Sequence, residues 1–145
     1  MLLALAAAVS LLAAAAPEPT PTPAAPPLEG TRWKLVRVGD RTVATPPSPR
    51  QAHLVFDAES GRVSGAGGCN RLSGAYERSG DRLTFSKMAG TMMACVEGME
   101  TEKAFLEALT KVKSFRIEGQ ELELLDEGGR VLARFEAAPD PGAET

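Results

Sequence analysis

Histidine and cysteine are scarce in this chain of 145 residues, which has one histidine, His53, and two cysteines, Cys69 and Cys95. They lack the close spacing of a zinc site, so we expect no metal and no cofactor. A thiol nucleophile needs a base, and Cys69 with His53 is the pair that the sequence offers for a thiol enzyme. A lone histidine in an apolar strand is more often a half-buried packing residue, and we therefore expect no enzymatic activity.

The chain also lacks a block of like charge. It has 16 Lys and Arg against 19 Asp and Glu, which gives a formal net charge of −3. Binding to nucleic acid calls for a basic face, and binding to an anionic membrane calls for a polybasic segment. The sequence shows neither, so we expect no nucleic-acid partner.

No hydrophobic run is long enough to span a membrane as a helix. Residues 1–16 carry no charged side chain, but a spanning helix needs roughly 20 apolar residues. The length and alanine-rich end of this segment suit the apolar region of a signal peptide, and the alternative is a buried N-terminal helix. No cysteine precedes Cys69, so a lipoprotein anchor is not expected. We predict a periplasmic or secreted monomer with no stable membrane anchor after signal removal.

Prolines alternate in the next segment, residues 17–27, and predict an extended linker. The folded domain is expected to cover residues 28–137, followed by a disordered tail at residues 138–145.

Within the domain, residues 98–112 show one apolar stripe at helical spacing, with acidic residues at the start and Lys111 and Lys113 at the end. The remaining segments alternate with a period of two and are separated by turn residues. Their order is about five strands, one helix and three strands. We predict the α+β class, with a strongly curved, barrel-like and mainly antiparallel sheet of about eight strands, and the α-helix between the fifth and sixth strands.

The stretch GAGGCNRLSGAY, residues 65–76, resembles a phosphate-binding loop only superficially. It lacks the final Gly-Lys-Ser/Thr of a Walker loop, and Asn70 stands where a dinucleotide loop has its last glycine. It also leads into a strand rather than a helix. The glycines are better explained by positive φ angles or a close backbone approach at a bend.

The two cysteines suggest a disulfide, because an even number of cysteines in an exported chain is typical of pairing. A Cys69–Cys95 bond would stabilise the fold by about 3–4 kcal/mol in the chain-entropy model. Two separate buried thiols are the alternative.

Several motifs together resemble the META domain, the family of the heat-shock protein HslJ. They are LEGTRWKL at residues 28–35, GAGGCNRLSG at 65–74, TMMAC at 91–95, the E-x-x-F-L-x-x-L pattern that begins at Glu102, and the closing strands at 122–124 and 131–135. The resemblance implies a small curved antiparallel sheet with one helix in a bacterial envelope or secreted protein. The family is linked to heat shock, novobiocin resistance and, in protozoan members, motility or virulence, and it has no established enzymatic reaction.

We therefore predict a non-enzymatic, exported, stress-related domain that binds a small ligand or an envelope protein. The candidate binding residues are Asn70, Arg71, Thr91 and Met92, because a side chain between glycines on a loop is well placed to meet a ligand. The competing interpretation is that Asn70 bonds neighbouring backbone, as asparagine does in turns.

Two further alternatives involve the segment around Cys95. A disulfide-held loop at residues 87–97 could act as an inhibitor module on a hydrolase. Methionines also flank Cys95; we expect them to fill the core beneath the helix, although they could instead form an adaptable apolar surface or bind copper(I): Met88, Met92, Met93 and Met99.

Overall fold

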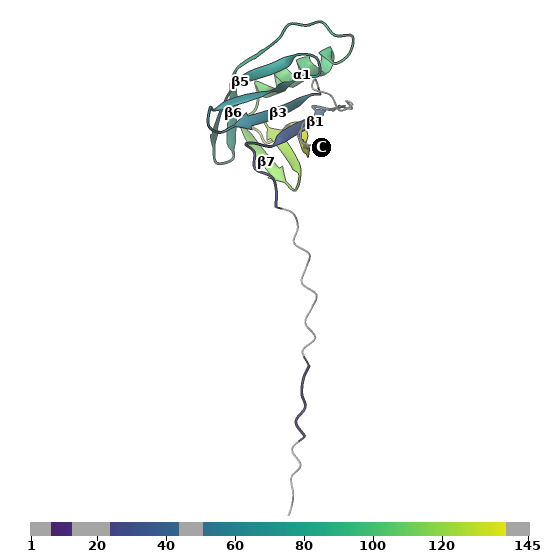
Figure 1. Cartoon of the computed structure of the whole chain (residues 1–145), viewed down its shortest axis with the longest axis vertical. Helices are drawn as coiled ribbons and strands as arrows, with labels where there is room; N and C mark the ends of the chain where they lie inside the picture. Colours follow the sequence, from purple (N-terminus) through teal and green to yellow (C-terminus); the bar gives the residue numbers. More distant parts are fainter. Residues whose placement is uncertain (1–6, 13–23, 44–50, 139–145) are drawn as a thin grey trace, which may run out of the picture.

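The computed structural model describes residues 7–12, 24–43 and 51–138 of the chain (Figure 1). Residues 7–12 have no helix or strand. The rest of the predicted signal peptide, residues 17–23 of the predicted linker and residues 139–145 of the predicted tail lie outside the described residues.

The described residues form one antiparallel sheet of nine strands with a single α-helix. Eight strands close into a ring, because β1 pairs with β3 on one side and with β9 on the other, while the short β2 extends from β1. The elements are β1 (Arg32–Val38), β2 (Arg41–Thr42), β3 (His53–Asp57), β4 (Arg62–Ala66), β5 (Arg71–Ser79), β6 (Arg82–Gly90), α1 (Met99–Leu109), β7 (Ser114–Glu118), β8 (Glu121–Leu125) and β9 (Val131–Ala138).

The predicted fold class is confirmed. Alternation along the strands turns one set of side chains into the barrel and the other toward solvent. Trp33, Phe56 and Phe135 are fully buried inside, and the Trp33 indole Nε1 donates to the Leu28 carbonyl oxygen at 3.0 Å. An eight-stranded barrel has an interior that side chains can fill, so this interior is a core and not a channel.

Helix α1 packs against β1, β6 and β9, which are not all neighbours in the ring. The helix therefore spans the barrel between these strands, and its Phe105 ring lies 5.8 Å from that of Phe135. It ends at Leu109, so Lys111 lies beyond the last turn and not within it as the sequence predicted. Val112 still reaches the core and is buried.

The prediction that the methionines fill the core is wrong for three of them. Met88 packs partly against the core, but Met92 is 99% exposed, and Met93 and Met99 are 45% and 41% exposed. The physical reason is that the segment between β6 and α1 is held on the outside of the barrel by Cys95 and by the contacts described next.

Candidate functional site

Residues 67–70 of the glycine-rich stretch form the loop between β4 and β5, and the rest of the stretch belongs to these two strands. Gly67 N–H donates to the Asn70 carbonyl oxygen at 3.0 Å and closes this loop. Cys69, at its tip, is bonded to Cys95 in a disulfide whose Cα atoms are 5.9 Å apart. The loop is thereby joined to the segment that leads into α1.

Asn70 connects three parts of the chain. Its Oδ1 accepts from the Met93 N–H at 2.7 Å and from the Thr91 hydroxyl at 2.9 Å. Its Nδ2 donates to Glu102 Oε2 at 2.7 Å and to the Met93 carbonyl oxygen at 3.3 Å. Asn70 is only 4% exposed, so both ends of its amide are used within the protein.

Glu102 comes from the first turn of α1 and completes this network. Its Oε1 accepts the backbone N–H of Asn70 at 2.6 Å, while Oε2 accepts the side-chain amide. The carboxylate is 6% exposed. A buried carboxylate needs such donors, because an uncompensated one is costly to remove from water. The network therefore fixes the start of the helix to the loop.

Two glycines permit this close approach. A Cβ on Gly67 would lie 2.5 Å from Glu102 Cγ, so a side chain there would displace the carboxylate. A Cβ on Gly98 would lie 2.6 Å from the Gly68 carbonyl oxygen, and Gly98 also has a φ of +92°. The stretch is thus a structural crossing where backbone and helix meet closely.

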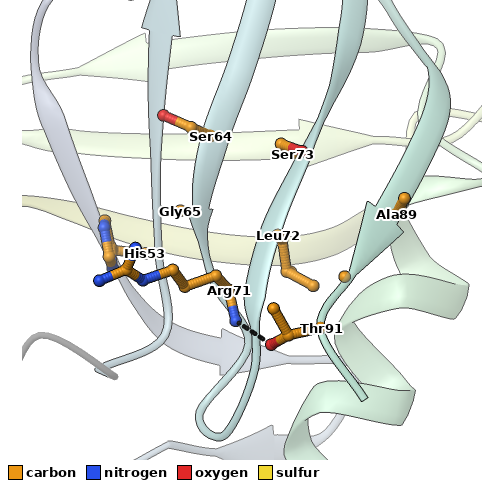
Figure 2. A pocket seen from close by; sticks show the side chains of 9 residues that line it. His53, Ser64, Gly65, Arg71, Leu72, Ser73, Ala89 and Thr91 are labelled. Carbon is orange, nitrogen blue, oxygen red and sulfur yellow. Dashed lines mark hydrogen bonds between the residues drawn. The ribbon is translucent and has the colours of Figure 1, made fainter.

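Beside this crossing, a groove of about 570 Å³ lies on the outer face of the sheet (Figure 2). It is lined from four strands and the residue after β6: His53, Ser64, Gly65, Arg71, Leu72, Ser73, Ala89, Gly90 and Thr91. The Thr91 hydroxyl accepts from the Arg71 N–H at 3.2 Å and donates to Asn70, so this rim of the groove is tied to the disulfide-held crossing.

Register places the polar side chains of the groove together. Ser64 pairs with Ser73, and residues paired across neighbouring strands share a face. Figure 2 shows the Arg71 side chain extending along the groove toward His53. Arg71 is exposed, and its guanidinium makes no hydrogen bond or ion pair with another described residue.

His53 is the titratable group of the groove. Its Nδ1 lies 2.6 Å from the Gln51 carbonyl oxygen and therefore carries the proton, which leaves Nε2 as an acceptor in the neutral ring. Burial lowers the pKa of His53 below its ordinary value; the bond to Gln51 opposes this, and the charge of Arg32 lowers the pKa further. The ring is thus favoured in its neutral form.

The structure separates the four candidate binding residues. Arg71 and Thr91 line the groove, Asn70 is turned inward, and Met92 projects into solvent. The backbone that the Asn70 side chain contacts belongs to Met93, on a distant segment, and not to its own turn.

Thiol chemistry has no free cysteine to use, since Cys69 and Cys95 are bonded to each other. Within the described part of the chain, no cluster of three or more His, Cys, Asp or Glu could hold a metal. No helix in those residues is long and apolar enough to cross a membrane.

Sequence reasoning missed Ser64, Ser73 and Glu102 as members of this region. The period-two pattern predicts that the two serines face outward, but their pairing depends on strand register. Glu102 was read as a residue favoured at a helix start, and nothing local showed that it reaches Asn70.

The described residues form a closed antiparallel sheet with one helix, a disulfide at the β4–β5 loop and a groove on the outer face. Residues 26–139 match the META domain, and the chain belongs to that family. The family is not known as enzymatic.

Solved structures show the same fold. An NMR structure of a protein from Burkholderia xenovorans is 29% identical, with a TM-score of 0.61 over 88% of this chain and 95% of that one. A second NMR structure is 22% identical with a TM-score of 0.60, over 76% and 91% of the two chains. A crystal structure of a DUF4847 family protein from Bacteroides vulgatus is 15% identical with a TM-score of 0.56, over 78% and 96%. Among curated proteins, none matches this chain in sequence.

Proposed function

We propose that this META domain is an exported, non-enzymatic binding protein whose outer groove takes a small ligand. The observation that carries the proposal is the groove over β3 to β6, with Arg71, Ser64 and Ser73 converging on it. Its volume of about 570 Å³ falls within the range of roughly 300–1,000 Å³ that is usual for ligand sites.

The walls of the groove support this role because they are preorganised. Most lining residues belong to hydrogen-bonded strands, and Thr91 is held by Asn70. The disulfide fixes the crossing from which that rim extends. A site that is already ordered loses less conformational entropy when a ligand binds.

Export is supported by the apolar segment at residues 1–16, the proline-rich segment after it, and the cysteine pair. The stress-related role rests on the family alone. We expect the intact mass of the protein recovered from the periplasm or medium to lack the signal segment. Alkylation should add two labels only after reduction. Labelling without reduction would contradict an oxidising destination.

The direct test of ligand binding is an NMR titration of the isotope-labelled protein with a library of small acidic, basic and neutral compounds. We expect saturable shifts of backbone amides at Ser64, Arg71 and Ser73. Amides at the far turn around Gly119 should not move. If no compound of any class shifts the groove signals, the proposed binding function is wrong.

A protein-facing role is the second candidate, because the segment before α1 exposes apolar side chains. Met92 is 99% exposed and Val96 is fully exposed, on a segment fixed by Cys95. An inhibitor module should slow one of a set of secreted proteases and lysozymes, and a variant with Met92→Ser and Val96→Ser should lose that effect. Absence of inhibition across the set by the wild-type protein would rule this candidate out.

A further inference from the structure

The groove carries the positive charge of Arg71, which forms no ion pair with a described carboxylate. Arg32 and Lys34 project outward from β1, where Lys34 pairs in register with His53 of β3 and with Glu136 of β9. None of the ion pairs among the described residues includes Arg32, Lys34 or Arg71. Five of the other eight described arginines form an ion pair with a carboxylate, as Arg78 does with Glu29.

Arg32 adds an independent observation. Its Nε and Nη2 are buried and have no hydrogen-bond partner among the described residues. Its charge also acts on His53. Arg32 lines a separate hollow beside Val55, while Arg71 lines the groove itself. Together their charges give this side of the sheet a positive potential that favours a negatively charged ligand.

Hydroxyl donors and open space complete the site. Ser64 and Ser73 lie side by side on β4 and β5, and both are exposed in the groove. A Cβ on Gly90 would lie 2.9 Å from Leu72 Cδ2, so a side chain there would crowd the buried Leu72. Ala89 and Leu72 supply apolar lining. The groove is larger than one oxyanion requires, so the ligand has room for an organic part.

We propose that the groove binds a small organic anion whose carboxylate or phosphate group is held by the Arg71 guanidinium and the hydroxyls of Ser64 and Ser73. This inference rests on the proposed function and names its ligand class. Arginine suits the role because its planar fork of N–H donors matches both oxyanions.

Binding has a consequence for His53. The charge of Arg32 opposes protonation of its ring. Lys34 pairs with His53 in register and has Glu136 of β9 on its other side, while Arg71 lines the groove with His53. A bound anion offsets this charge and favours the imidazolium form. The pKa of His53 is therefore expected to rise when the anion binds.

The test compares benzoate with benzamide, which has the same shape and no charge, and with inorganic phosphate, all at constant ionic strength. We expect benzoate or phosphate to bind at least tenfold more tightly than benzamide, as measured from the shifts of the groove amides. We also expect the bound anion to raise the pKa of the His53 imidazole, measured by NMR. The benzoate arm reports a carboxylate site, and the phosphate arm reports a phosphate site.

Arg71→Gln should weaken that binding by about tenfold or more, because it removes charge-assisted hydrogen bonds. Arg62→Gln is the matched control: Arg62 is an exposed arginine on the outer face of β4 that does not line the groove. It should change the affinity less than twofold. Equal losses in the two variants would show nonspecific charge attraction and overturn the assignment.

The outcomes separate the two proposals. If benzamide binds as tightly as benzoate, the ligand is not selected as an anion, while small-ligand binding in the groove stands. If neither anion shifts the groove signals but neutral or basic library compounds do, the anion inference is wrong and the proposed function survives. If no compound of any class shifts them, both fail.

Discussion

Asn70 and Glu102 show how two polar residues can be buried at the edge of a β-barrel without leaving an unsatisfied group. The Glu102 carboxylate receives both the backbone and the side-chain N–H of Asn70, and the other end of the amide is bonded to Met93 and Thr91. Because each donor meets an acceptor, the network specifies one geometry for the helix start. A substitution of either residue should therefore lower the stability of the fold more than the same substitution at an exposed position.

Glu102→Gln is the sharpest test at this scale. The amide group would place a donor against an N–H of Asn70, so we expect the free energy of unfolding to fall by about 1–3 kcal/mol. Glu107→Gln makes the same change at an exposed position of α1 and should cost less than about 0.5 kcal/mol. Urea unfolding measures both. Equal values for the two variants would mean that the network contributes nothing to stability.

Sequence reasoning at the residue scale identified Arg71 and Thr91 in the right neighbourhood. It could not decide how Asn70 is oriented, because the partners of Asn70 are more than 20 positions away in sequence, at Met93 and Glu102. Local rules for asparagine describe turns and cannot show contacts that only tertiary structure creates. The sequence offers His53 as a possible base for Cys69 but favours a half-buried packing residue; in the structure His53 is buried and lines the groove together with Arg71.

At the scale of elements, the β4–β5 loop and the N-terminus of α1 form one joint. The disulfide and the Asn70 network tie them from the side chains, while Gly68 and Gly98 let the two backbones approach. The glycine at position 98 also precedes the helix without a side-chain cap. The helix start therefore depends on this joint and not on local capping.

Gly98→Ala tests the joint. It adds strain from a φ of +92° and a Cβ placed 2.6 Å from the Gly68 carbonyl oxygen. Gly119→Ala adds strain from a φ of +58° but meets no atom within 4 Å, and should cost about 1–2 kcal/mol. We expect Gly98→Ala to lower the free energy of unfolding by about 1–2 kcal/mol more than Gly119→Ala does, because the backbone must move. If urea unfolding shows similar losses of stability for the two variants, the close approach of the backbones at Gly68 and Gly98 does not constrain the fold.

The elements themselves were largely predictable. Period-two alternation located the main strands, and the apolar stripe located α1, because these patterns follow directly from which face is buried. The two-residue β2 gives no such pattern, as both Arg41 and Thr42 are exposed. The methionine segment was misjudged because composition suggested a core, whereas the disulfide and Asn70 hold that segment outside it.

For the whole molecule, closure of the ring between β1 and β9 leaves one weakly paired seam. β6 and β7 share a single register pair, Arg82 with Ser114, and α1 is inserted between them in sequence. The barrel shape was predictable from many short strands. The weak pairing of β6 with β7 was not predictable, because it depends on where α1 separates these two strands in the chain.

Acid should destabilise the whole fold in two steps. The pKa of His53 is lowered by burial below 6.5, so the unfolded chain binds the proton more readily and stability falls as pH drops below that value. The pKa of Glu123 is lowered below 4.5, mainly by its hydrogen bond to Arg116, so its contribution is present above 4.5 and is lost as pH falls through the lowered value.

Urea unfolding at several pH values should resolve these steps. His53→Asn should flatten the loss between about pH 7.5 and about pH 5.5 and leave the lower step, whereas Glu123→Gln should flatten the lower step. An unchanged slope in the His53 variant between those values would show that this imidazole does not govern the upper step.

If the groove on the outer face of β3 to β6 is a ligand site, a large side chain that fills it should prevent binding. Ser73→Trp places a large ring in the groove. Ser79→Trp places the same ring at an exposed position of the same strand, β5, outside the groove. Each variant is titrated by NMR with the compounds that shift wild-type groove signals. We predict that binding is lost in Ser73→Trp and retained in Ser79→Trp. Equal binding by both variants, or equal loss of binding in both, would show that the ligand does not occupy this groove.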